Sequence, residues 1–188
     1  MTSEKTYTAF AGPRRLAAGP LRDLLPVLKK RFDRDGADIV LVFEDETGSQ
    51  VDFNLRGSLD DVLDRHAPTT RRAPGRPRLG VKSREVTLLP RHWDWLEQQP
   101  KSISATLRRL VDQAAKTETG PARAKRIRAA LSHVLTALAG DRPNYEEACR
   151  ALFAGRTSQF ETLIAHWPKD IRDYARQRAA EAARVDET

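Results

Sequence analysis

Cysteine, aromatic residues and long apolar runs are scarce in this sequence, and each scarcity excludes a class of protein. A single cysteine among 188 residues excludes an internal disulfide framework. Aromatic residues make up only 6% of the chain while 31% are charged, so much of its surface is solvated. No stretch approaches the roughly 20 apolar residues of a membrane span, and the first ten residues lack the apolar centre of a signal peptide. We expect a cytoplasmic protein of bacterial type with no membrane partner.

Catalytic and cofactor-binding patterns are also missing from the sequence. The four histidines lie far apart, without partners at the spacing of metal ligands. There is no glycine-rich phosphate loop and no nucleophile elbow. The acids Glu44, Asp45, Glu46 and Asp52 are typical of a solvated turn rather than a calcium site. The sequence therefore predicts a protein that is not an enzyme and that needs no cofactor or metal.

Positive charge is concentrated in the middle of the chain. Residues 68–116 hold 11 Lys and Arg against 4 Asp and Glu, whereas residues 1–67 hold 10 against 12 and residues 117–188 hold 12 against 10. The middle segment thus accounts in effect for the whole net charge of +7. A local concentration of this kind is typical of a protein that binds a polyanion such as DNA.

A basic segment, RRAPGRPRLGVKSR, occupies residues 71–84 and contains no acidic residue. Its two prolines and two glycines exclude a helix, so we expect an extended, solvated arm. The arm supplies six candidate DNA contacts: Arg71, Arg72, Arg76, Arg78, Lys82 and Arg84. Its centre, Gly-Arg-Pro-Arg at 75–78, resembles the core of an AT-hook, which implies binding in the narrow minor groove of A·T-rich DNA. A basic linker without a DNA role is the alternative.

Residues 84–116 predict a strand, a short helix, a turn and a second helix. Side chains alternate with period two over 84–89 before Pro90, and a helical pattern follows over 91–99. An apolar stripe at helical spacing runs from Ile103 to Ala115 and should be buried. This order of elements resembles the ribbon-helix-helix family of bacterial DNA-binding proteins. The resemblance implies a homodimer whose paired strands form a ribbon in the major groove.

The ribbon-helix-helix resemblance also implies a role for each strand position. Val86 and Leu88 would face the dimer core, while Glu85, Thr87 and Leu89 would face the bases. Only Thr87 has a side chain well suited to base edges. A helical pair that serves to dimerise or to brace the fold is therefore the alternative.

Three further residues complete the predicted DNA interface. Ser102 and Ser104 stand at the start of the second helix, where the resemblance implies that backbone amides hold a phosphate. Arg91 stands at the start of the first helix. Each would contact the DNA backbone or the edge of the groove.

The flanking regions predict an α+β protein. Residues 5–18 form a hairpin, residues 21–32 a helix containing Pro26, and residues 39–43 an apolar strand expected at the centre of a sheet. Residues 50–55 form its return strand, and Ser58 caps a helix over 59–66. We divide the chain into a small α/β domain (1–67), a basic arm (68–83), a ribbon-helix-helix-like segment (84–116) and a helical region (117–188).

The helical region contributes a predicted core and a second basic run. Phe153, Phe160 and Trp167 recur at helical spacing and are expected in the core. The helix over 122–138 carries a cluster of cations at Arg123, Lys125, Arg126 and Arg128. This run either extends a phosphate-binding surface or forms a solvated face.

Taken whole, the chain resembles a family of uncharacterised bacterial proteins, a domain of unknown function. The resemblance is carried by residues 75–81, 84–93, 146–153 and 167–170. It spans nearly the full length and implies no activity. The residues themselves favour a dimeric DNA-binding protein, either a transcriptional regulator or a nucleoid-associated factor. The alternative is a protein-interaction module, antitoxin-like or an adaptor, that binds a protein partner without reading DNA.

Overall fold

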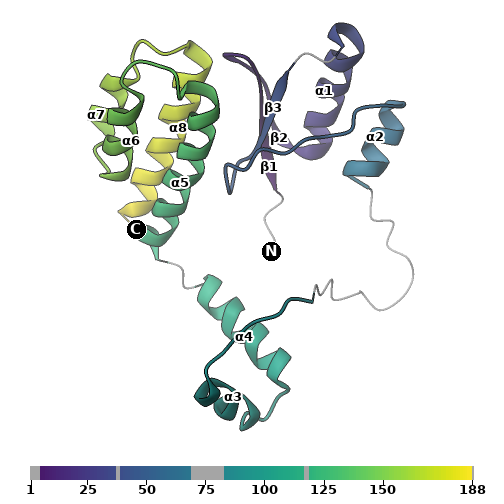
Figure 1. Cartoon of the computed structure of the whole chain (residues 1–188), viewed down its shortest axis with the longest axis vertical. Coiled ribbons are helices and arrows are strands. Elements are labelled where there is room, and N and C mark those ends of the chain that lie inside the picture. Colours follow the sequence, from purple (N-terminus) through teal and green to yellow (C-terminus); the bar gives the residue numbers. More distant parts are fainter. Residues whose placement is uncertain (1–4, 37–38, 69–82, 117–118, 188) are drawn as a thin grey trace. The chain divides into compact units, whose positions relative to one another are not determined.

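A computed structural model of the chain describes residues 5–36, 39–68, 83–116 and 119–187. These residues form three strands and eight helices, so the predicted α+β class is confirmed (Figure 1). The chain divides into two compact units, unit 1 with residues 1–69 and 119–188 and unit 2 with residues 70–118. The first strands and the last helices therefore pack together although unit 2 separates them in the sequence.

The sheet of unit 1 has three antiparallel strands in the order β2-β1-β3. Strands β1 (Thr6–Ala11) and β2 (Arg14–Pro20) form the predicted hairpin. Strand β3 (Val40–Glu44) pairs with the other side of β1, from Tyr7 opposite Glu44 to Ala11 opposite Val40. The predicted third strand is thus confirmed, but its expected central position is wrong because β1 holds the centre.

The first four residues of β3, 40–43, are all apolar because both faces of the sheet are covered (Figure 1). On one face, Val42 of β3 packs with Leu24 and Leu28 of α1 (Leu21–Asp35). On the opposite face, Phe43 joins the core of the C-terminal helices. A strand between two apolar layers loses its alternation wherever it stands in the sheet.

The C-terminal helices of unit 1 are α5 (Gly120–Ala139), α6 (Tyr145–Phe153), α7 (Thr157–Leu163) and α8 (Lys169–Asp186). Phe160 and Trp167 are buried among them, as predicted. The prediction for Phe153 is wrong, since its side chain is 52% exposed. It is the last residue of α6, and Leu152 takes the inward position on that turn.

Polar contacts join the sheet to α8. The Thr8 hydroxyl, which is buried, donates to Asp45 Oδ1 at 2.7 Å. The Arg178 guanidinium of α8 donates to the Asp45 carbonyl oxygen at 2.7 Å. Tyr174 of α8 packs edge-on against Phe10 at 5.6 Å between ring centroids, and its burial, with the nearby Asp45 charge, raises its pKa to about 12.

The short helix α2 (Leu59–His66) is capped by Ser58, as the sequence predicts, and the structure shows that Asp61 completes a capping box. The Asp61 amide donates to Ser58 Oγ at 3.2 Å, while the Asp61 carboxylate accepts from the Ser58 amide at 2.8 Å. The hydrogen bonds from the Ser58 side chain and backbone lower the pKa of Asp61. Two orphan amides at the helix start are thereby satisfied.

The predicted return strand over residues 50–55 does not form. A single bridge joins Gln50 to Phe43, and the Val51 amide donates to the Val42 carbonyl at 2.8 Å. Beyond Val51 the segment turns toward α2, where the Asn54 carbonyl accepts from Arg65 Nη1 at 2.7 Å. The Asn54 carbonyl is therefore bonded to side chains of α2 instead of to a neighbouring strand.

Candidate nucleic-acid interface

Unit 2 contains the two helices that the sequence predicts, α3 (Pro90–Glu97) and α4 (Ile103–Lys116). Helix α3 starts on Pro90, a position where the missing amide costs no hydrogen bond. The extended backbone of Leu89, with φ −68° and ψ 151°, leads into it. A turn that contains Pro100 then separates the two helices.

The predicted ribbon strand at 84–89 is not a strand within the single chain. Residues 83–89 make no ladder with any other part of the chain that the structure describes. A ribbon strand has its partner in a second chain. Pairing between chains therefore stays a prediction.

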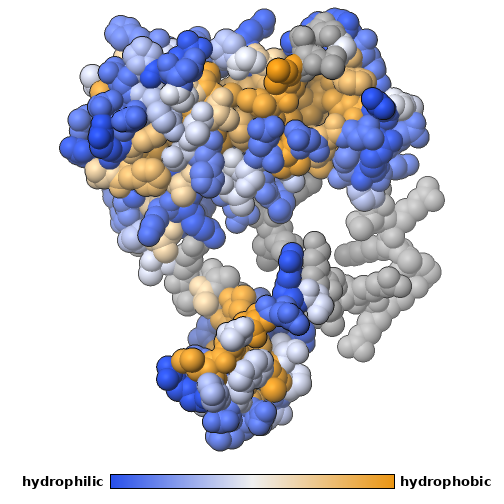
Figure 2. Space-filling model, viewed as in Figure 1, coloured by the Kyte–Doolittle hydropathy of each residue, from blue (hydrophilic) through white to orange (hydrophobic). Residues whose placement is uncertain are grey.

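The two helices bury little of their own apolar surface. Leu96 and Thr106 are 3% and 2% exposed and form the inside of the unit. The predicted burial of the α4 stripe is wrong: Val111, 65% exposed, and Ala114 are exposed, and Ile103, Leu107 and Leu110 are only half-buried. We name the exposed large apolar side chains of this unit the unit 2 apolar surface: Val86, Leu89, Trp95 and Val111. Figure 2 shows hydrophobic residues at the surface of this unit.

The small size of unit 2, residues 70–118, is consistent with this exposure. A unit of fewer than about 70 residues rarely builds a core worth more than about 3–5 kcal/mol, and such units often rely on a metal, a disulfide or a partner. The described residues contain no group of His, Cys, Asp and Glu that could hold a metal. The side chains of the unit 2 apolar surface are therefore left exposed in the single chain.

The predicted DNA contacts divide into two groups. Five of them lie outside the described residues: Arg71, Arg72, Arg76, Arg78 and Lys82. The other five are exposed, with Arg84 and Thr87 in the extended stretch, Arg91 in the first turn of α3, and Ser102 and Ser104 at the start of α4. The structure thus brings the second group onto one small unit.

The start of α4 has the properties of an anion site. Ser102 Oγ accepts from the Ala105 amide at 3.4 Å, and the Ser102 carbonyl accepts from the Thr106 amide at 2.9 Å. The first turn contains no acidic residue. The remaining first-turn amides and the helix dipole favour a negatively charged group at this end.

Unit 2 also exposes cations that are not among the predicted DNA contacts. Lys101 lies in the turn, and Arg108 and Arg109 lie on α4, all three exposed. The charge count of the segment includes them, but helical periodicity alone did not single them out. In unit 1, by contrast, Arg128 of the α5 basic run bonds to Asp186 at 2.7 Å and so helps to hold α5 against α8.

Comparison with known proteins gives one match. A family model described as "Uncharacterized protein conserved in bacteria (DUF2239)" matches residues 6–179. No curated protein and no solved structure matches the chain. In the part of the chain that the structure describes, no helix has the length and apolar character to cross a membrane.

Proposed function

The chain belongs to this family of uncharacterised bacterial proteins, whose description carries no activity, and we propose that it is a DNA-binding protein that acts as a homodimer through unit 2. The observation that carries the proposal is the coincidence of two features on one small unit. The unit holds 11 Lys and Arg against 5 Asp and Glu, which is +6 of the net charge of +7, and it exposes the unit 2 apolar surface. The first feature suits a polyanion, and the second suits a partner chain.

A second copy of unit 2 is the partner that the geometry favours. Each copy would contribute the extended stretch 83–89, whose backbone is open for pairing, and the exposed side chains of Val86 and Val111. Antiparallel pairing of two such stretches satisfies both backbones and covers both apolar surfaces in one isologous contact. The two α4 starts would then lie on one dimer, as two phosphate sites.

DNA is the polyanion that the charge pattern favours. The arm supplies cations suited to the minor groove, and unit 2 adds Arg84, Arg91 and Lys101. Only Thr87 on the predicted ribbon is well suited to base edges, so most of the affinity would come from phosphates and groove shape. The role would be that of a transcriptional regulator or a nucleoid-associated factor, without a catalytic step.

The proposal is tested by fluorescence-anisotropy titration of A·T-rich and G·C-rich duplexes at several salt concentrations. We expect tighter binding to the A·T-rich duplex and, for about six phosphate contacts, a log–log salt slope of about −5. Changing Arg76 and Arg78 together to Ala should abolish the A·T preference and reduce the slope by about two.

The control is a double variant that loses two positive charges from unit 1 instead of from the arm. Arg142 and Arg150 are exposed in and before α6 of unit 1, and their double change to Ala should leave binding unaltered. Absence of binding to either duplex, or binding that does not respond to salt, would overturn the proposal. Capture of a stoichiometric protein partner in its place would support the interaction module.

A further inference from the structure

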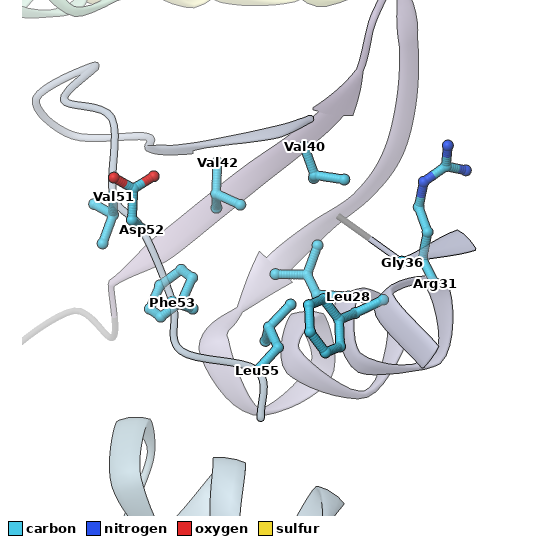
Figure 3. Close-up of a pocket in the computed structure, with 10 residues that line it drawn as sticks. Leu28, Arg31, Gly36, Val40, Val42, Val51, Asp52, Phe53 and Leu55 are labelled. Carbon is cyan, nitrogen blue, oxygen red and sulfur yellow. The ribbon is translucent and has the colours of Figure 1, made fainter. Parts of the chain in front are cut away.

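A cavity of about 210 Å³ lies in unit 1 beside the edge of β3 (Figure 3). Its apolar walls come from Leu28 and Phe32 of α1, Val40 and Val42 of β3, and Phe53 and Leu55 of the segment that follows. A cavity of about 150 Å³ accommodates benzene, so this one admits an aromatic ring or a short alkyl chain. The space exists because residues 52–55 leave β3 instead of pairing with it.

The far wall of the cavity is held open by contacts with α2. The Asn54 carbonyl accepts from Arg65 Nη1 at 2.7 Å and lies 3.1 Å from His66 Nε2. The Phe53 ring packs edge-on against the His66 ring at 5.1 Å and against Tyr7 at 6.2 Å between centroids. Phe53 is therefore fixed from behind, and the cavity is preformed rather than a gap that closes freely.

Two charged side chains lie at opposite ends of the lining. Figure 3 shows Arg31 at the end near Gly36 and Asp52 at the end near Val51. Asp52 is exposed, and its carboxylate lies 3.4 Å from the Gln50 side-chain amide. Arg31 is partly buried and already interacts with another group of the chain, but a guanidinium has five donors and can hold a carboxylate beside that contact.

From this arrangement we infer that unit 1 binds a small monocarboxylic acid with an apolar body. The alkyl or aryl body fills the space between Leu28, Val42 and Phe53, and the carboxylate lies at the Arg31 end. A guanidinium matches a carboxylate in both charge and planar geometry. The inference concerns unit 1 alone and does not depend on DNA binding by unit 2.

The test compares three ligands of equal chain length on the full-length protein. Octanoate, octan-1-ol and octylammonium are titrated below their micelle concentrations, with methyl NMR and isothermal calorimetry as readouts. We expect the affinity order octanoate, octan-1-ol, octylammonium, with an advantage of about tenfold for the acid over the alcohol. The methyl signals of Leu28, Val40, Val42 and Leu55 should shift together.

Two variants separate the body of the ligand from its charge. Val40→Phe fills the cavity and should abolish binding of all three ligands, while Val27→Phe, on the exposed side of the same α1 helix, should not. Arg31→Gln should remove the advantage of octanoate and leave the affinity for octan-1-ol unchanged.

Two outcomes would overturn the inference. Equal affinities for octanoate and octan-1-ol in the unchanged protein would refute the acid as the ligand class. Failure of all three ligands to shift the lining methyl signals would refute the site itself. If Val40→Phe does not fold, Arg31→Gln still tests the role of the charge, because this variant leaves the apolar walls of the cavity unchanged.

Discussion

Gly48 occupies the loop after β3 in a conformation that no other residue would adopt there without strain. Its φ is +68°, and a Cβ atom would lie 2.1 Å from the carbonyl oxygen of Ala130 on α5. The loop can approach the helix backbone only because this side chain is absent. The nearby His133 Nδ1 lies 3.1 Å from the Thr47 carbonyl oxygen, so the same loop also contacts α5 through a side chain.

We predict that Gly48→Ala destabilises the protein by about 2–5 kcal/mol, from left-handed strain together with overpacking. Gly12→Ala is the matched control, because Gly12 also has a positive φ of 55° but has no atom within 4 Å of a Cβ position. Its cost should be only about 1–2 kcal/mol. Urea unfolding of both variants measures the difference, and equal costs would contradict the close approach to α5.

Because of Tyr174, we expect the free energy of unfolding to depend on pH in the alkaline range. Its pKa in the folded chain, about 12, lies above the ordinary value of 10.0. The folded state therefore retains a proton that the unfolded state releases above pH 10. Stability from this residue is fully present below pH 10 and should fall by about 2 kcal/mol as the pH rises to 12.

In the Tyr174→Phe variant, this loss of stability between pH 10 and 12 should disappear, while the packing against Phe10 is kept. Urea unfolding at pH 9, 10.5 and 11.5, about the range set by the shift, provides the measurement. Tyr7→Phe, on the opposite side of the sheet, serves as control and should retain the fall. An identical pH profile for Tyr174→Phe and the unchanged protein would refute the assignment.

At the scale of elements, the extended stretch 83–89 differs from β3 in how its apolar side chains are covered. Leu41 and Phe43 of β3 meet the C-terminal helices of the same chain, whereas Val86 has 63% of its surface exposed. Both stretches have a strand-like pattern, but only the apolar side chains of β3 are packed against other elements of the same chain. Val86 is therefore the position at which the dimer proposal is most directly tested.

We expect Val86→Lys to convert the dimer into a folded monomer of 21.2 kDa and to weaken DNA binding by the loss of avidity. Phe153→Lys is the matched control, since Phe153 is an apolar side chain of similar exposure on unit 1. That variant should remain dimeric. Sedimentation equilibrium measures the mass, and an unchanged protein that sediments as a monomer at micromolar concentration would contradict the proposal.

At the scale of the whole molecule, the chain is a compact unit with a second unit inserted into its sequence. Residues 1–69 and 119–188 form one body with a continuous core that includes Phe10, Leu135 and Ile171. None of the residues of unit 2 that the structure describes belongs to that core. The protein thus separates the region of concentrated positive charge from the region that contains the cavity.

Replacement of residues 70–118 by a flexible Gly/Ser linker of about 20 residues should leave unit 1 folded. We expect cooperative thermal unfolding and octanoate binding to be retained, and DNA binding to be lost. Calorimetry and the ligand titration described above provide the measurements. Loss of cooperative unfolding in this variant would show that unit 1 depends on unit 2.

Local sequence determined most of the helices and the charge of the candidate interface. Ser58 and Asp61 fix the start of α2, Pro90 fixes the start of α3, and the cations of residues 68–116 can be counted without a structure. Caps, proline positions and apolar spacing act within a few residues, so the chain itself reveals them.

The tertiary structure decided which faces are covered. Elements distant in the sequence decide the edge position of β3 and the exposure of Phe153 and Val111. They also decide that residues 52–55 do not pair with β3. An apolar pattern indicates which side chains tend to be buried, but it does not identify the segment that packs against them. The cavity beside β3 and the unit 2 apolar surface follow from that non-local choice, and local periodicity could not have predicted either.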